Sequence, residues 1–297
     1  MAVIWIFNKN SSSGYKPAIN GQLENLSTDT LTLRNPWVSD SVFMAKLYTA
    51  MTLALALSFY PDIADPEYRP ILLERTQSVI QYIFAPLIFT PFLAYRIYFI
   101  KKLSNFHFIR STKKIYYQRG KKLITFDWNK THGGVFKRTE FGGSSFSTSY
   151  ALAFAPPRED GSLHQKDCLW VDSNEPTESD IKHVAEVWEY IRQFMNHGPS
   201  KLPPPGDPNW WHRPLHAICL TPAEAWRHYA PWRTGEPGEM QGKKNWQLPF
   251  WAVLFPYNLG LAIGWYAVCR LFNVRAAPPP PEAFDEAPVQ LKKGKRK

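Results

Sequence analysis

Two long apolar stretches in the first third of the chain constrain its fold more than any other feature. The second, Ser78–Lys102, has only two strongly polar interruptions, Gln81 and Arg96, and ends in two lysines. The first, Ser41–Tyr60, contains a single charged residue, Lys46. Each approaches the ~20 residues that a helix needs to cross ~30 Å of hydrocarbon. The sequence therefore predicts a transmembrane α-helical hairpin over residues 41–102, with spans at about 42–60 and 79–100.

The charges that flank this hairpin indicate its orientation. The connection, residues 61–77, carries four acidic residues against two arginines, whereas Lys101, Lys102 and further basic residues follow the second span. Basic residues favour the cytoplasmic side of a membrane. We therefore expect residue 101 onward to be cytoplasmic.

The composition limits how much of the chain is in lipid. The 297 residues have a mean hydropathy of −0.33 and a net charge of +10, so a polar domain must accompany a few membrane helices. The three cysteines are far apart and have no CxxC spacing. They indicate neither a metal site nor a disulfide framework.

Residues 103–200 consist of short β-type runs followed by one helix. The runs are 106–110, 114–119, 121–128, 134–140, 147–154 and 168–172. Such spacing is typical of an antiparallel sheet or a small barrel. The helix, 178–197, has an apolar stripe of Ile181, Val184, Trp188, Ile191 and Met195. We expect an α+β soluble domain with the order of a pleckstrin-homology-like barrel; a generic α+β sandwich is the alternative.

The segments on either side of this domain have their own character. Residues 1–40 are irregular with a short strand at Thr30–Arg34, and we expect them to pack on the soluble domain or the membrane face. Residues 201–247 are rich in proline and tryptophan with basic residues between. This composition favours an interfacial segment, with Trp210 and Trp211 as candidate lipid- or partner-binding residues. Ordinary packing is the alternative.

Residues 248–272 are long enough for a third transmembrane helix, in which Asn258 is a polar group that needs a partner on another helix. A third crossing places the tail, 273–297, outside; the tail is low in complexity and predicted to be disordered. Its basic end, Lys292–Lys297, favours the inside, although the rule weakens at that distance from a span. We retain three spans, and a third segment that does not cross is the alternative.

The sequence lacks recognisable catalytic and metal-binding motifs. None of the eight histidines belongs to HExxH, GxSxG is absent, and Gly142–Ser145 lacks the lysine of a phosphate-binding loop. The acidic residues from Asp172 to Asp180 are explained by the N-terminus of the predicted helix. We expect a non-enzymatic protein with no cofactor and no metal.

A basic hairpin is the clearest candidate binding surface. Its residues are Lys113, Lys114, Arg119, Lys121 and Lys122, with two tyrosines between them. Basic and aromatic residues together occur in nucleic-acid-binding proteins. Because the hairpin closely follows a predicted span, membrane lipid head groups are the nearer phosphates. Lipid contact and plain solvation are the two interpretations, and we expect no nucleic-acid partner.

The helix end Trp188–Pro199, WEYIRQFMNHGP, together with the early spans, the strand-rich domain and the proline linker, resembles a family of uncharacterised bacterial membrane proteins. Those proteins are encoded near type VI secretion clusters and their toxic effectors. The resemblance implies a multi-pass inner-membrane protein with an immunity or accessory role, which acts by binding a cognate effector toxin. A membrane-anchored lipid-binding or scaffolding module is the second hypothesis.

Overall fold

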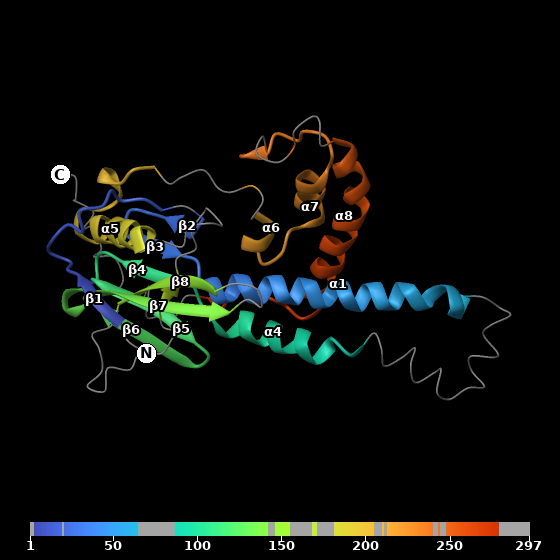
Figure 1. The fold of residues 1–297 in the computed structure, drawn as a ribbon, viewed down its shortest axis with the longest axis horizontal. Helices are drawn as coiled ribbons and strands as arrows, with labels where there is room; N and C mark the ends of the chain where they lie inside the picture. Colours follow the sequence, from blue (N-terminus) through green and yellow to red (C-terminus); the bar gives the residue numbers. More distant parts are fainter. Residues whose placement is uncertain are drawn as a thin grey trace, which may run out of the picture. The chain divides into compact units, whose positions relative to one another are not determined.

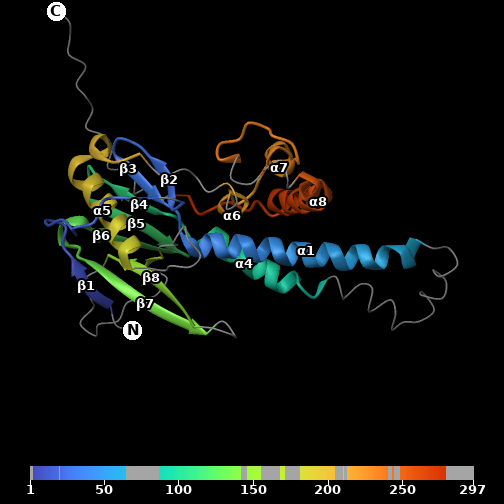
Figure 2. The same ribbon diagram turned by 45° about the horizontal axis from the view of Figure 1, so that its top comes forward.

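The computed structural model describes residues 3–19, 21–64, 87–141, 146–154, 168–170, 181–204, 210, 213–239, 243 and 248–278. The chain divides into two compact units, each assembled from segments that are distant in sequence (Figures 1 and 2). We call residues 1–36, 102–207 and 277–297 the α+β unit, and residues 37–101 and 208–276 the helical unit.

The α+β unit contains two antiparallel sheets. The five-stranded sheet has the order β2-β3-β4-β5-β6, formed by Leu23–Leu26, Thr30–Leu33, Phe106–Ile109, Lys114–Arg119 and Lys122–Asp127. The four-stranded sheet has the order β1-β7-β8-β9, formed by Val3–Phe7, Gly133–Phe141, Phe146–Ala153 and Leu169–Trp170. The predicted antiparallel strands are therefore confirmed. The closed barrel is not: the described strands form two separate sheets.

The N-terminal segment contributes strands to both sheets. β1 pairs with β7, and β3 pairs with β4 at the centre of its sheet, where all four β4 residues are buried. β3 was predicted from the sequence, whereas β1 and β2 were not. The backbone N–H of Ser13 also donates to the buried carboxylate of Glu189 over 3.3 Å, so this segment packs on the α+β unit as expected.

Helix α5, Ile181–His197, packs against strands of both sheets. Four residues of the predicted stripe are buried, whereas Ile181 is 37% exposed because it stands at the first turn. The expected start of the helix, 178–180, lies outside the described residues. Gly198 ends the helix with a φ of +80°, a conformation that glycine adopts without strain, and a short 3-10 helix, Pro199–Lys201, follows.

Strand β7 passes very close to α5 because it begins with two glycines. A Cβ atom on Gly133 would lie 2.7 Å from the ring of Trp188 and 2.8 Å from Cβ of Phe7. The Trp188 ring stacks on Phe7 at 5.7 Å and tilts against Trp128 at 5.2 Å. The core between α5 and the β1–β7 pair is therefore built around one indole.

The residues that flank one end of each of α1, α4 and α8 lie close together in the α+β unit. Asn35, which precedes the first helix, donates to the carbonyl of Ser104 over 3.1 Å. The backbone N–H of Ala277, which follows the last helix, donates to the carbonyl of Leu103 over 3.4 Å. Leu103 itself directly follows helix α4. The chain thus leaves and re-enters this unit at neighbouring positions.

The helical unit contains the apolar helices. The described helices of this unit are α1 (Pro36–Ala64), α4 (Thr90–Lys102), α6 (Arg213–His216), α7 (Pro222–Tyr229) and α8 (Leu248–Leu271), of which α6 and α7 are short and polar. By length and composition, Pro36–Ser58 and Pro249–Leu271 could each cross a membrane. The predicted span 79–100 lies partly outside the described residues, and its described remainder is the short helix α4.

The two long helices expose much of their apolar surface. Leu57 on α1 is 70% exposed, and Val253 and Leu271 on α8 are 75% and 78% exposed. Only 22% and 11% of the two apolar windows are buried. Neither helix therefore resembles the core helix of a water-soluble protein, which buries such residues.

Candidate functional site

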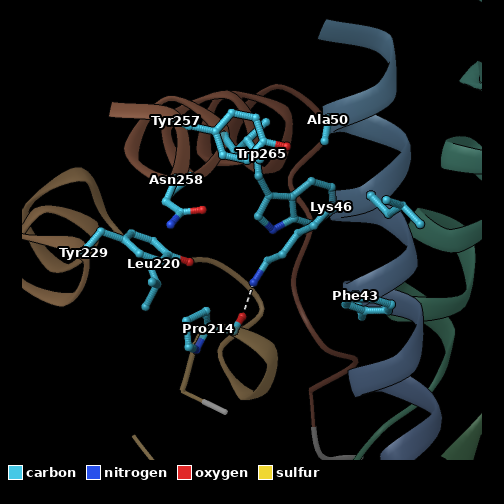
Figure 3. Close-up of a pocket in the computed structure, with 12 residues that line it drawn as sticks. Phe43, Lys46, Ala50, Pro214, Leu220, Tyr229, Tyr257, Asn258 and Trp265 are labelled. Atoms are coloured by element: carbon cyan, nitrogen blue, oxygen red, sulfur yellow. Dashed lines mark hydrogen bonds between the residues drawn. The ribbon is translucent and has the colours of Figure 1, made fainter. Parts of the chain in front are cut away.

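A pocket of about 240 Å³ lies within the helical unit (Figure 3). Helices α1, α7 and α8 and the segment 214–220 form its walls. Most of the lining is apolar, including Phe43, Leu47 and Leu261. Lys46, Tyr229 and Asn258 contribute polar groups from three different helices.

Lys46 extends from α1 into the pocket instead of turning toward the end of its helix. Its ammonium donates hydrogen bonds to the carbonyls of Pro214 and Ala217, the latter over 3.2 Å. Pro214 belongs to the one-turn helix α6 and Ala217 follows it directly. In so short a helix the carbonyls lack helical partners and can accept hydrogen bonds from a cation. Within the described residues, no carboxylate forms an ion pair with Lys46.

The other polar groups of the pocket come from helices α7 and α8. The indole Nε1 of Trp265 donates to the carbonyl of Ile218 over 2.6 Å and ties the wall segment to α8. Burial raises the pKa of Tyr229 to about 12, so its hydroxyl is a protonated donor at neutral pH. The described residues provide no hydrogen-bond partner on another helix for Asn258, and its side chain faces the pocket (Figure 3).

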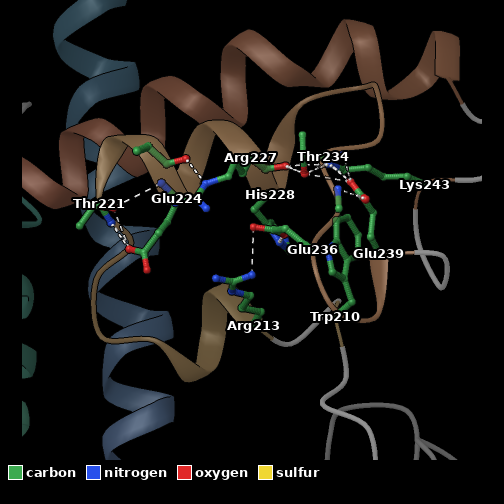
Figure 4. A network of polar contacts seen from close by, with 12 residues as sticks. Trp210, Arg213, Thr221, Glu224, Arg227, His228, Thr234, Glu236, Glu239 and Lys243 are labelled. Atoms are coloured by element: carbon green, nitrogen blue, oxygen red, sulfur yellow. Dashed lines mark hydrogen bonds and ion pairs between the residues drawn. The ribbon is translucent and has the colours of Figure 1, made fainter.

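A second polar cluster holds the segment that links α6 to α8 (Figure 4). Glu236 forms an ion pair with Arg213 at 2.9 Å, accepts a hydrogen bond from the indole Nε1 of Trp210 over 3.2 Å, and lies 3.3 Å from Nδ1 of His228. The ring of Trp210 stacks on His228 at 4.2 Å and is 1% exposed. Trp210 is therefore a packing residue in this structure.

The most buried ion pair of the cluster joins Glu239 and Lys243, at 2.7 Å. The ammonium also donates to the carbonyls of Arg227 and Trp232, and the carboxylate accepts the backbone N–H groups of Thr234 and Gly235. Burial alone would raise the pKa of Glu239, but these hydrogen bonds outweigh it and lower the pKa to about 2.

Trp226 and Trp232 differ from Trp210, because they are exposed. Trp226 and Trp232 are 45% and 48% exposed, and their rings meet edge to face at 5.8 Å. Both contact Phe255 of α8. This exposed aromatic cluster has the composition of an interfacial surface, whereas Trp211 lies outside the described residues.

The five basic candidates of the hairpin do not form one patch. Lys113 and Lys114 stand at one end of β5, and Arg119, Lys121 and Lys122 stand at the β5–β6 turn, about 17 Å away along the strand. The ammonium of Lys113 donates to the carbonyl of Met195. At the other end, the backbone N–H of Gly120 donates to the carbonyl of Lys102 over 2.6 Å. The turn and the end of α4 thus form one basic corner.

Among the described strands, β1 is an edge of its sheet and has exposed apolar side chains. In the order β1-β7-β8-β9, β1 is terminal. Its alternate residues Ile4 and Ile6 are 60% and 52% exposed, whereas Phe7 is buried. Natural edge strands are usually protected by charges, prolines or bulges against pairing with another chain. Between Val3 and Phe7 the sequence offers no charge and no proline, and the only such protection in β1 is an irregularity in its pairing with β7 between Trp5 and Phe7.

The fold also brings together two cysteines that the sequence leaves unrelated. The side chains of Cys219 and Cys269 are neighbours, and Lys46 lies near both. Both cysteines are free thiols. Spacing in the sequence gives no sign of this pair, because one member lies in a loop and the other on α8.

A family model described as a family of unknown function, DUF6708, matches residues 48–286. The chain belongs to this family. The DUF6708 match begins within α1 and continues beyond α8, so strands β1 to β3 precede the matched residues. Comparisons with curated proteins and with solved structures gave no match.

Proposed function

We propose that this protein is a non-enzymatic, membrane-anchored binding protein of the bacterial inner membrane, with its α+β unit in the cytoplasm. In this proposal it serves a type VI secretion locus as an immunity or accessory protein that binds a cognate effector. The genomic setting rests on the resemblance in sequence. The exposed apolar edge of β1 is the observation that carries the binding role.

The β1 edge suits a partner that adds a strand. Its free backbone groups supply affinity, and alternate side chains supply selectivity. Ile4 and Ile6 are both exposed, and Ile6 stands at the irregularity in pairing between Trp5 and Phe7. An apolar edge of this kind is a hazard unless another chain covers it. We therefore propose that a strand of the effector pairs with the free edge of β1.

Charge substitution on this edge is expected to abolish protection without unfolding the protein. The test co-expresses the neighbouring candidate toxin with the wild type or with the double variant Ile4→Lys/Ile6→Lys and measures survival. Ile181→Lys, at a half-buried position on α5, is the matched control and should protect as well as the wild type. If the toxin kills equally with and without the wild type, the immunity role is wrong; if the double variant protects fully, the β1 site is wrong.

The anchoring rests on α1 and the hairpin that returns through α4. Both connections of residues 208–276 lead to the α+β unit. A segment that leaves one side of a membrane and returns to it crosses an even number of times. Residues 208–247 have no apolar run near the ~20 residues of a span. We therefore favour the alternative in which α8 lies at the cytoplasmic interface, together with the exposed cluster of Trp226, Trp232 and Phe255.

This topology predicts that Ser200 and the C-terminus both lie on the cytoplasmic side. A cysteine that replaces Ser200, and a cysteine appended after Lys297, should each react with a membrane-impermeant maleimide only after the inner membrane is opened. The parent protein gives the background from native cysteines. Labelling of the C-terminal cysteine in intact spheroplasts would instead establish a third crossing.

A membrane-anchored lipid-reading scaffold is the second candidate, favoured by the basic corner beside Lys102. In the same co-expression test, Lys121→Glu/Lys122→Glu reverses two exposed charges at this corner. Loss of protection with this variant but not with the β1 variant would favour the scaffold. The opposite pattern would favour the effector-binding edge.

A further inference from the structure

Within the part of the chain that the structure describes, the ammonium of Lys46 in this pocket has no counter-ion. Two of the three ammonium N–H groups are directed to the carbonyls of Pro214 and Ala217, which leaves one for a ligand. The surrounding side chains are mostly apolar. An ammonium removed from water is unfavourable unless an anion accompanies it. A negatively charged group in the pocket would supply that anion.

Two neutral donors complement this charge. The hydroxyl of Tyr229 and the amide of Asn258 line the same pocket from α7 and α8, and both side chains point toward its centre (Figure 3). Within the described residues neither side chain has a hydrogen-bond partner. Together with Lys46 they place donors on three sides of the space that an anion would occupy.

The size of the pocket indicates part of a ligand. Its volume of about 240 Å³ is below the ~300–1,000 Å³ of sites that enclose a complete small molecule. The exposed side chains of Phe43, Leu47 and Tyr257 lead from the pocket onto the apolar surfaces of α1 and α8. A ligand with a polar head and an apolar chain matches both regions, because the head fits the pocket and the chain can lie along the apolar surfaces of α1 and α8.

We propose that this pocket binds the head group of an anionic phospholipid from the cytoplasmic leaflet, and that Lys46, Tyr229 and Asn258 donate hydrogen bonds to it. This inference rests on the membrane anchoring proposed above and does not involve the effector. Lys46 stands four residues, or about 6 Å, inside the predicted apolar run 42–60, close to head-group level. The cytoplasmic leaflet is the one that carries anionic lipid.

Native mass spectrometry of the full chain in mild detergent tests the proposal. Phosphatidylglycerol and phosphatidylcholine with identical acyl chains are added in equal amounts, and the two adducts are compared. The wild type should retain phosphatidylglycerol with a preference of about tenfold, equivalent to about 1.4 kcal/mol. Lys46→Met should reduce the preference to near one, whereas Lys46→Arg and the exposed control Lys101→Met should keep it.

Further variants separate a lost ligand from a lost fold. A bifunctional thiol reagent should still join Cys219 to Cys269 in Lys46→Met if the helical unit is intact. If it does not, Asn258→Leu decides, because it leaves the carbonyl contacts of Lys46 in place; a roughly threefold loss of preference is expected. No preference in the wild type, or an unchanged preference in the intact variants, overturns the proposal.

Two controls show whether the anion is a lipid or free phosphate, and whether a negative result refutes the lipid site or the membrane anchoring. If millimolar inorganic phosphate displaces phosphatidylglycerol, the pocket recognises phosphate alone and the lipid assignment is wrong. If the chain is recovered from cells without detergent, the anchoring is wrong and this inference falls with it. Lipid preference without effector protection would refute the immunity role alone.

Discussion

Replacing Lys243 with methionine is expected to destabilise the protein by about 3–5 kcal/mol, the cost of leaving a buried partner charge uncompensated. The side chains of Lys243 and Glu239 are only 1% and 5% exposed, and they meet at 2.7 Å. The substitution also leaves the carbonyls of Arg227 and Trp232 without this donor. Thermal or denaturant unfolding of the full-length protein in detergent measures the loss.

The pH dependence identifies the carboxylate as the origin of this loss. Glu239 has a pKa of about 2 in the folded protein, against an ordinary value of 4.5. Its contribution is therefore fully present above pH 4.5 and is lost as the pH falls toward 2. In Lys243→Met, Glu239 becomes easier to protonate, because burial is no longer opposed by the ammonium. The stability difference between the two proteins should narrow below pH 4.5.

His228 titrates close to this range and must be separated from Glu239. Burial lowers the pKa of His228 to about 4, so the folded state binds its proton less readily than the unfolded state. This contribution decreases as the pH falls from 6.5 through 4. The charge of Lys243 is the smallest of the effects that act on the pKa of His228, so the difference between the two proteins reports mainly on Glu239. The double variant Glu239→Gln/Lys243→Met should recover part of the loss; an equally unstable double variant would contradict the ion-pair explanation.

The strands of residues 106–170 could be predicted because turn residues separate each from the next. The pairing of β1 with β7 could not, since it joins residues more than a hundred positions apart. The run VIWIF also gives no alternation of apolar and polar residues, because Ile4 and Ile6 are exposed although apolar. With β1 in the four-stranded sheet, the described strands form two sheets where a closed barrel was expected.

The polar groups of the site show a similar division. Asn258 was recognisable as a polar residue in an apolar helix. The role of Lys46 was not, because its partners Pro214 and Ala217 follow it by about 170 positions and act through backbone carbonyls, which no side-chain pattern reveals. Trp210 and Trp226 are both tryptophans beside basic residues, yet only the structure separates the buried one from the exposed one.

Truncating Trp188 to alanine is expected to cost about 3–5 kcal/mol, a large share of the ~5–15 kcal/mol that stabilises a typical domain. Trp188 is fully buried and joins Phe7 of β1 to Trp128 beside α5. Near-UV circular dichroism during denaturant unfolding of the full chain should show an earlier transition. Trp226→Ala removes an equally large but half-exposed side chain and is the matched control, with an expected loss below about 1 kcal/mol.

A double-mutant cycle with Gly133 tests whether this loss arises from the close β7–α5 contact. Gly133→Ala alone should cost about 1–3 kcal/mol, because the new Cβ would stand 2.7 Å from the Trp188 ring. In the Trp188→Ala background that clash is removed, while the 2.8 Å approach to Phe7 remains. The combined loss should therefore be smaller than the sum of the single losses by at least about 0.5 kcal/mol. Strict additivity would mean that the two residues do not meet, and that α5 does not pack on β7 through this indole.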